Sequence, residues 1–305
     1  MTATRALTPR AIARARRRAA VGGFWRQFRR DREGMVGLSI MVLFAFVALA
    51  APLLADADGL SVTRATGPVL APPSLDYPFG TDNAGRSVLT MVIWGSRISL
   101  LVGLCATVIA MVIGTLIGIS SGHFRGPTGG ILDRLTEWFL VIPYLPLAIV
   151  LAIVFPPTVP RIVAVIIVIG VTGWSSTARL IRAQTLSIEE RPYLERARAL
   201  GAGHWHQMSR HVLPNVMPLV LAHTTLTVSV AILAETTLSF LGLGDPLRVS
   251  WGRILDQAYS GAVISTGSWW WVGFPGLCVV LVVLGFNLCG RALERILDPR
   301  LRERA

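Results

Sequence analysis

The sequence of 305 residues is 53% hydrophobic and only 15% charged, with a formal net charge of +12. A water-soluble domain of this length would carry more charge and less apolar surface, so the composition indicates an integral membrane protein. All 29 basic residues are arginine. The lack of lysine excludes a P-loop ATPase site and a Schiff-base enzyme on this chain.

The N-terminal segment, residues 1–34, is strongly basic. Ten arginines precede the first apolar run, with only two acidic residues among them. We interpret residues 1–20 as a disordered basic tail held near anionic lipid, rather than as a nucleic-acid-binding arm. Phe24, Trp25 and Phe28 alternate with arginines, which predicts a short helix in the membrane interface.

Six apolar runs approach the length of about 20 residues that a helix needs to cross the hydrocarbon core. A soluble helical core is excluded because runs such as Ile162 to Ile169 are apolar on every side. Arginine is concentrated in alternate loops, so the positive-inside rule places both termini in the cytoplasm. The basic lead is too long for a signal peptide, and we expect the first span to stay uncleaved. The expected spans lie at about 35–55, 98–121, 136–155, 161–180, 216–242 and 271–292.

The segment at about 56–96 is rich in Pro, Gly and Asp and shows no hydrophobic period, so we expect an external loop. In the second span, glycines recur every four residues, at Gly114, Gly118 and Gly122. This spacing predicts close helix packing, either within this chain or at a subunit interface. Three cysteines lie in apolar runs and are interpreted as packing residues.

Two prolines, Pro143 and Pro146, fall within the third expected span. Proline lacks the N–H that a helix interior requires, so we expect a kink or local unwinding there.

A polar, helix-forming loop, residues 181–215, separates the fourth and fifth spans. The stretch Glu189 to Pro192 favours a helix start, and Gly201 favours a left-handed C-cap. A second short helix is expected from His204 to about Val212, closed by Pro214. Two short helices joined at a glycine form an angled hook.

On the first helix of this hook, Leu194, Ala197 and Gly201 share one small, apolar face that a partner protein can approach closely. The alternative is a solvated loop in which Glu195 only pairs with Arg191 or Arg198.

Three histidines in the loop raise the question of a metal site. Zinc requires four fixed ligands, and no cysteine lies nearby, so we expect no metal. We expect His211 to fix the turn into the fifth span instead.

The fifth span contains an ionisable residue, Glu235, whose placement in a bilayer costs on the order of 2.5–3.5 kcal/mol. One hypothesis is that it lines or gates a transport path together with Thr236, Ser239 and Phe240. The alternative is a structural glutamate bonded to a neighbouring helix. His223 is a weaker candidate of the same kind.

Four tryptophans, at position 251 and at positions 269–271, cluster near the external ends of the last two spans. We interpret them as an aromatic belt at the membrane interface. The alternative is a grip on an external protein.

Five separated motifs resemble the C-type permeases of dipeptide and oligopeptide ABC importers, over about residues 24–302. The chain departs from the family pattern at Arg196, where Ala is usual, and at Arg291, where Asp is usual. The matching motifs are Phe79-Gly80-Thr81-Asp82 with Gly85-Arg86 and Gly95-Ser96-Arg97; Glu195, Ala197 and Gly201 with His211-Val212-Leu213-Pro214-Asn215; ETTLSFLGLG at 235–244 with Ser250-Trp251-Gly252-Arg253; Phe274-Pro275-Gly276; and Asn287 to Gly290 with Leu297 to Leu301.

The resemblance implies an all-α membrane protein with six transmembrane helices, the type I ABC importer permease fold and a multi-pass location in the plasma (inner) membrane. It makes the loop at 181–215 the ATPase-coupling loop, with contacts at Leu194, Glu195, Ala197, Gly201, His211 and Pro214. It implies as partners a second homologous permease subunit, two ATP-binding subunits or one fused ATPase, an extracytoplasmic solute-binding protein and the lipid bilayer, but no nucleic acid.

ATP and magnesium are expected on the partner subunits, and this chain is expected to hold no cofactor and to catalyse no reaction. Peptides are the expected solute, while nickel chelates, glutathione and glycans are alternatives that the sequence leaves open. An ion-coupled secondary transporter is a different class. It would need buried coupling groups, for which only Glu235 and His223 lie deep enough, and it often shows internal repeats, which we do not see.

We expect four parts along the chain. These are a basic cytoplasmic tail and interfacial helix at 1–34, the first transmembrane helix and external loop at 35–97, a permease core with five transmembrane helices at 98–292, and a cytoplasmic tail at 293–305.

Overall fold

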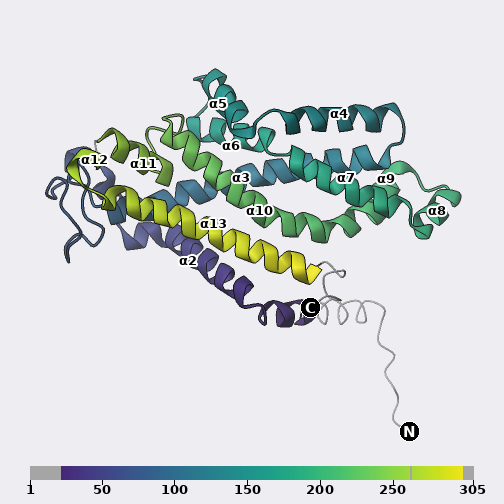
Figure 1. Cartoon of the computed structure of the whole chain (residues 1–305), viewed down its shortest axis with the longest axis horizontal. Helices are drawn as coiled ribbons and strands as arrows, with labels where there is room; N and C mark the ends of the chain where they lie inside the picture. Colours follow the sequence, from purple (N-terminus) through teal and green to yellow (C-terminus); the bar gives the residue numbers. More distant parts are fainter. Residues whose placement is uncertain (1–21, 262, 298–305) are drawn as a thin grey trace, which may run out of the picture.

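The computed structural model of the chain describes residues 22–261 and 263–297 (Figure 1). The basic tail expected at 1–20 and the last motif, beyond Leu297, lie outside the described residues. Within them the chain is helical, and its β-structure is a single antiparallel bridge between Thr81 and Ser87. The all-helical architecture predicted from the hydropathy pattern is confirmed.

Five helical segments of the described chain are long and apolar enough to cross a membrane, and a sixth span results if two helices joined at a sharp bend count as one. The bent pair is α4 and α5, inclined to each other by 92°. The five segments are α2 (Arg32–Leu54), α3 (Val88–His123), α6 with α7 (Arg161–Thr172 and Ser175–Glu189), α9 to α10 (His204–Phe240) and α13 (Trp270–Leu297).

The third expected span, at 136–155, is the one that the structure changes most. It is replaced by α4 (Pro127–Val141) and α5 (Tyr144–Val154), of 15 and 11 residues, and neither is long enough to span a bilayer alone. The break lies at Ile142 and Pro143, where Ile142 adopts the extended conformation that proline favours in the residue before it. The predicted kink is confirmed, and α4 with α5 can form the third span as a broken one.

Two other boundaries differ from the expected ones. Helix α3 begins at Val88, ten residues before the expected position, where the Ser87 side chain caps it. Helix α7 continues to Glu189, so the first part of the expected loop at 181–215 is helical. At α3, the short stretch Gly95-Ser96-Arg97 separates the apolar residues 88–94 from the rest of the apolar run. At α7, the polar residues near the helix end carry little apolar signal. The hydropathy pattern therefore places both boundaries too close to the bilayer centre.

Helix α3 is central and packs against α7, α10, α6 and α2. Its glycine stripe faces α7, as Gly118 shows most directly. A Cβ atom at Gly118 would lie 2.7 Å from the Ala178 carbonyl oxygen and 2.8 Å from the Ile181 Cβ. The stripe therefore serves packing within this chain, which was one of its two predicted roles.

One end of the molecule is closed by the segment between α2 and α3, together with α11 (Trp251–Ser260) and α12 (Val263–Thr266) (Figure 1). The segment includes two 3-10 turns, η1 (Ala57–Leu60) and η2 (Val62–Arg64). Arg86 is buried there, where its Nε donates to Asp82 Oδ2 at 2.7 Å and its second guanidinium nitrogen to Gln257 Oε1 at 3.1 Å. The Gly- and Asp-rich segment between α2 and α3 is therefore folded, and the Arg86–Gln257 hydrogen bond joins it to α11.

The tryptophans at this end do not form the predicted belt. Trp251, Trp270 and Trp271 are buried inside the chain, and only Trp269 is exposed. The Trp251 Nε1 donates to the Val92 carbonyl at 3.1 Å, and the Trp270 Nε1 donates to the Thr81 carbonyl at 3.1 Å. The indoles of Trp251 and Trp270 stabilise the packing, because their N–H groups donate to distant segments.

The opposite end carries α8, while both described ends of the chain lie on the α8 side of the middle of the molecule, well short of α8 (Figure 1). Residues 22–28 are helical, and Phe28 is buried against Cys289 and Ala292 of α13. Of the predicted interfacial residues, Trp25 is exposed, whereas Phe28 anchors the segment to the protein. Arg295 pairs with Glu33 at 2.8 Å, which joins α13 to the start of α2.

Candidate functional site at the loop between α7 and α10

The segment that follows α7 folds into a hook, which we define as residues 192–212. Its first arm is α8 (Pro192–Ala199), with proline in the first turn as predicted. Gly201 has a φ of +83°, a conformation that L side chains rarely adopt, and the following N–H of Ala202 donates to the Ala197 carbonyl at 3.0 Å. The predicted left-handed C-cap at Gly201 is confirmed.

The second arm of the hook does not end where the sequence predicts. Helix α9 (His204–Gln207) passes through a π-helical turn, η3 (Met208–Val212), directly into α10 (Leu213–Phe240). Pro214 does not close a helix, because it lies in the first turn of α10, where its missing N–H costs little. In this wider turn, the Leu213 N–H donates a hydrogen bond to the Met208 carbonyl, five residues back. The hook is therefore continuous with α10.

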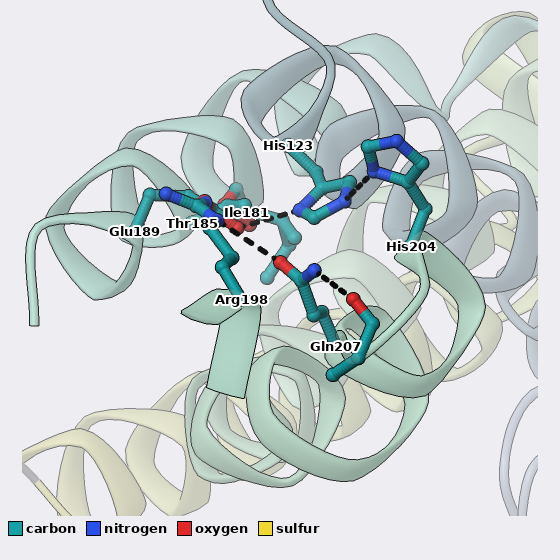
Figure 2. Close-up of polar contacts among 8 residues, drawn as sticks. His123, Ile181, Thr185, Glu189, Arg198, His204 and Gln207 are labelled. Carbon is teal, nitrogen blue, oxygen red and sulfur yellow. Dashed lines mark hydrogen bonds and ion pairs between the residues drawn. The ribbon is translucent and has the colours of Figure 1, made fainter. Parts of the chain in front are cut away.

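A buried polar cluster joins the hook to two helix ends (Figure 2). Glu189, the last residue of α7, is only 4% exposed. One carboxylate oxygen lies 2.6 Å from His123 Nδ1 at the end of α3, and the other accepts from Arg198 of α8. The prediction that Glu189 helps start the first hook helix is wrong, because both of its oxygens are used at the end of the preceding helix.

Arg198 and His204 extend this cluster into both arms of the hook. The Arg198 Nε donates to Gln207 Oε1 at 3.1 Å, and Gln207 in turn donates to the Ala202 carbonyl at 2.6 Å. His204 Nδ1 lies 2.9 Å from His123 Nε2 (Figure 2). Since Arg198 binds Glu189, it does not form the alternative pair with Glu195.

The residues predicted to contact a partner have different environments. Glu195, Gly201 and Pro214 are exposed, while Ala197 and His211 are half-buried. Leu194 is 0% exposed. The expected apolar docking face is therefore wrong at Leu194, which packs inside the chain and holds α8 in place.

Three exposed apolar side chains on the hook were missed by the sequence interpretation. Leu200 is 89% exposed and Trp205 is 76% exposed, and Tyr193 is also exposed. Their signal was weak, since a leucine before a glycine and a tryptophan between two histidines fit no periodic pattern.

The histidines of the hook do not converge on one point. His204 contacts His123, whereas the His206 ring packs on the His211 ring with centroids 5.6 Å apart. In the part of the chain that the structure describes, no group of three or more His, Cys, Asp or Glu residues is arranged to hold a metal ion.

Glu235 lies at the junction of α10, α3 and α11, and is 1% exposed. Ser99 Oγ donates to one carboxylate oxygen at 2.8 Å, and Ser239 Oγ donates to the other at 2.7 Å. The backbone N–H of Trp251 donates to Ser99 Oγ at 3.2 Å and continues the network. These contacts match the structural alternative for Glu235.

The other residues predicted to line the path with Glu235 differ in how far they are exposed. Thr236 is buried and donates to the Ile232 carbonyl of its own helix at 2.9 Å. Phe240 is exposed, and its ring packs on Tyr259 of α11 with centroids 5.8 Å apart. Of the four predicted path residues, Phe240 is the one with an open surface in this chain.

A small cavity of about 100 Å³ lies between α3, α6 and α10. His223 borders it, and its Nε2 is buried without a hydrogen-bond partner among the described residues. Other residues around the cavity include Thr107, Tyr144, Ser176 and Thr227.

Comparison with known proteins accounts for almost the whole chain. Residues 114–303 match the family described as "Binding-protein-dependent transport system inner membrane component". Residues 21–83 match the "N-terminal TM domain of oligopeptide transport permease C".

Several curated relatives align along their lengths. The dipeptide transport system permease protein DppC of Bacillus subtilis (strain 168) is 35% identical over 279 residues, covering 91% of this chain and 85% of that protein. The oligopeptide transport system permease protein OppC of the same organism is 35% identical over 278 residues, covering 91% and 88%. The di/tripeptide transport system permease protein DppC of Pseudomonas aeruginosa (strain UCBPP-PA14) is 35% identical over 289 residues, covering 92% and 93%.

Among solved structures, a chain from an amino acid ABC transporter crystallised with histidines aligns with a TM-score of 0.48 at 17% identity, covering 70% of this chain and 94% of that chain. The family assignment comes from the sequence matches and agrees with the apolar helices. The chain belongs to the inner-membrane components of binding-protein-dependent transport systems, as a multi-pass permease of the C-subunit type found in dipeptide and oligopeptide transport.

Proposed function

We propose that this permease is the C-type subunit of an ATP-driven importer for di- and oligopeptides, and that it forms half of the translocation path with a second, homologous permease. The peptide assignment is supported by the relatives, whose names specify dipeptide, oligopeptide and di/tripeptide transport. The importer would take its solute from an extracytoplasmic binding protein and its energy from ATP-binding subunits.

The observation that carries this proposal is the shape and surface of the hook. It stands at one end of the molecule, is continuous with α10 and exposes Leu200 and Trp205. Two large apolar side chains exposed on a protruding element suit contact with a partner surface. We assign that partner as an ATP-binding subunit, contacted by Glu195, Ala197, Gly201, His211 and Pro214 together with these two side chains. ATP and magnesium bind to the partner.

The positions of the described chain ends support the proposed orientation of the permease in the membrane. Both described chain ends lie on the hook side of the middle of the molecule, away from the folded Gly- and Asp-rich segment at the opposite end (Figure 1). In the proposed orientation the hook end is cytoplasmic and the opposite end faces the binding protein.

The proposal is tested by reconstituting this permease in lipid vesicles with its second permease, its ATP-binding subunits and its binding protein. We expect uptake of labelled di- and oligopeptides that stops when ATP is withdrawn, while a proton gradient is kept. Uptake that persists on the gradient alone would establish a secondary transporter. Uptake of nickel chelates, glutathione or glycans in place of peptides would correct the solute and keep the ATP-driven mechanism.

A further inference from the structure

The hook is attached by the chain to α7 and α10 only. Helix α3 ends at His123, 66 positions before Glu189 and 81 before His204, so any link between α3 and the hook must be non-covalent. The buried cluster of His123, Glu189, Arg198 and His204 supplies such a link (Figure 2).

Glu189 is the centre of this link. It uses one carboxylate oxygen toward α3 and the other toward α8, and it is almost completely buried. Charge-assisted hydrogen bonds are about twice as strong as neutral ones, and a buried carboxylate that loses a partner is costly. The carboxylate therefore resists separation of the hook from the end of α3.

His123 connects Glu189 to the second arm as well. A neutral imidazole that donates from Nδ1 to Glu189 accepts at Nε2 from His204, so one ring satisfies both neighbours. Arg198 on the first arm reaches the end of α3 through Glu189, and His204 on the second arm contacts His123 directly.

Helix α3 reaches from this cluster to the other buried glutamate. At a rise of about 1.5 Å per residue, Ser99 lies about 36 Å along α3 from His123. Ser99 donates to Glu235, and both belong to the packed junction of α3, α10 and α11. A displacement of α3 at its hook end therefore acts directly on that junction.

We propose that Glu189 is a positioning residue which, through His123 and Arg198, makes the end of α3 move with the hook as one body. This rests on the proposed coupling function of the hook. It adds a third helix, α3, to the two that are moved through the chain itself.

The test uses the complete importer in vesicles and measures ATP hydrolysed per peptide imported. We expect Glu189→Gln to raise this ratio several-fold, because the hook still docks but no longer carries α3 with it. The matched control is Glu190→Gln, which changes the adjacent, exposed glutamate and should keep the wild-type ratio. Unchanged coupling in an assembled Glu189→Gln complex overturns the inference.

A double-mutant cycle distinguishes loss of the Glu189–His123 interaction from a general loosening of the complex. His123→Gln should raise the ratio as Glu189→Gln does, and the double variant should add little, because both changes break one interaction. Independent, additive effects contradict a shared link. If the wild-type complex itself shows no ATP-dependent uptake, it is the proposed function that fails.

A distance measurement remains decisive even if these variants do not assemble. Spin labels at the exposed positions Arg125 and Arg196, in a complex whose three native cysteines are replaced, report the separation between the α3 end and the hook. We expect one distance that is the same with and without ATP. A distance that changes between the two states overturns the one-body movement.

Discussion

Glu189 and Glu195 lie six positions apart and have opposite environments. Glu189 is buried and bound on both oxygens, while Glu195 is exposed and forms no ion pair within the described ranges. A buried, bonded glutamate holds structure together, whereas an exposed, unpaired one is free to meet a partner. The sequence pattern singles out Glu195, and only the structure draws attention to Glu189.

We predict that Glu195→Arg weakens binding of the ATP-binding subunit and leaves the thermal stability of the permease unchanged. The side chain is exposed, so its replacement affects the free energy of unfolding by less than about 0.5 kcal/mol. Co-purification of the ATP-binding subunit and a melting curve in detergent measure the two quantities. Normal co-purification would remove Glu195 from the proposed interface.

Glu235 gives a second prediction at this scale. Glu235→Ala should lower the melting temperature, because Ser99 and Ser239 lose their shared acceptor inside the protein. Each buried group left unpaired costs about 1–3 kcal/mol. The matched comparison is Thr237→Ala on the same helix, whose hydroxyl bonds only to its own backbone. If Glu235→Ala kept full stability but abolished uptake, the gating hypothesis would replace the structural one.

At the scale of single elements, the two-armed hook depends on one backbone conformation. Gly201 and Gly203 both face open space, so a Cβ at either position meets no neighbour within 4 Å. They differ in φ, which is +83° at Gly201 and −69° at Gly203. Substitutions at these two positions therefore test the effect of backbone conformation separately from that of packing.

We predict that Gly201→Ala weakens coupling and that Gly203→Ala does not. An L side chain in the left-handed region costs about 1–2 kcal/mol, which favours rotation of the two arms away from the docking geometry. Gly201→Pro should act more strongly, since it also removes the N–H that donates to the Arg198 carbonyl at 2.9 Å. The readout is ATP hydrolysed per peptide imported. Equal ratios for the two alanine variants would show that the cap does not set the docking geometry.

Two further elements show how proline acts differently by position. Pro143 breaks the third expected span into α4 and α5, because it stands where a helix would have to continue. Pro214 breaks nothing, because it stands in the first turn of α10 after a π-helical turn. The same residue type thus ends one helix and is accommodated within another.

At the scale of the whole molecule, the two ends are built differently. The hook end holds a buried polar cluster, and the opposite end is a folded cap stabilised by tryptophans and the Asp82–Arg86 pair (Figure 1). The long helix α3 joins them: its 36 residues make it about 54 Å long, well beyond the hydrocarbon core of about 30 Å.

A topology experiment tests the proposed orientation. In intact cells, a single cysteine at Asp76 should react with a membrane-impermeant thiol reagent, because this residue is exposed on the cap that the proposed orientation places outside. A cysteine at Arg196 should react only after the membrane is opened. The native cysteines are replaced beforehand. The reverse pattern of labelling would invert the orientation and place the hook outside.

The membrane class, the helical architecture, the left-handed cap at Gly201 and the break at Pro143 could all be predicted from the sequence. They follow from hydropathy and backbone chemistry, which are local properties of neighbouring residues. The resemblance to peptide permeases rests instead on matching motifs. Only the tertiary structure decided that Leu194 faces inward, that Trp251, Trp270 and Trp271 are buried, and that Glu189 binds His123. Each of these depends on which distant segments pack together, and periodicity along one segment does not contain that information.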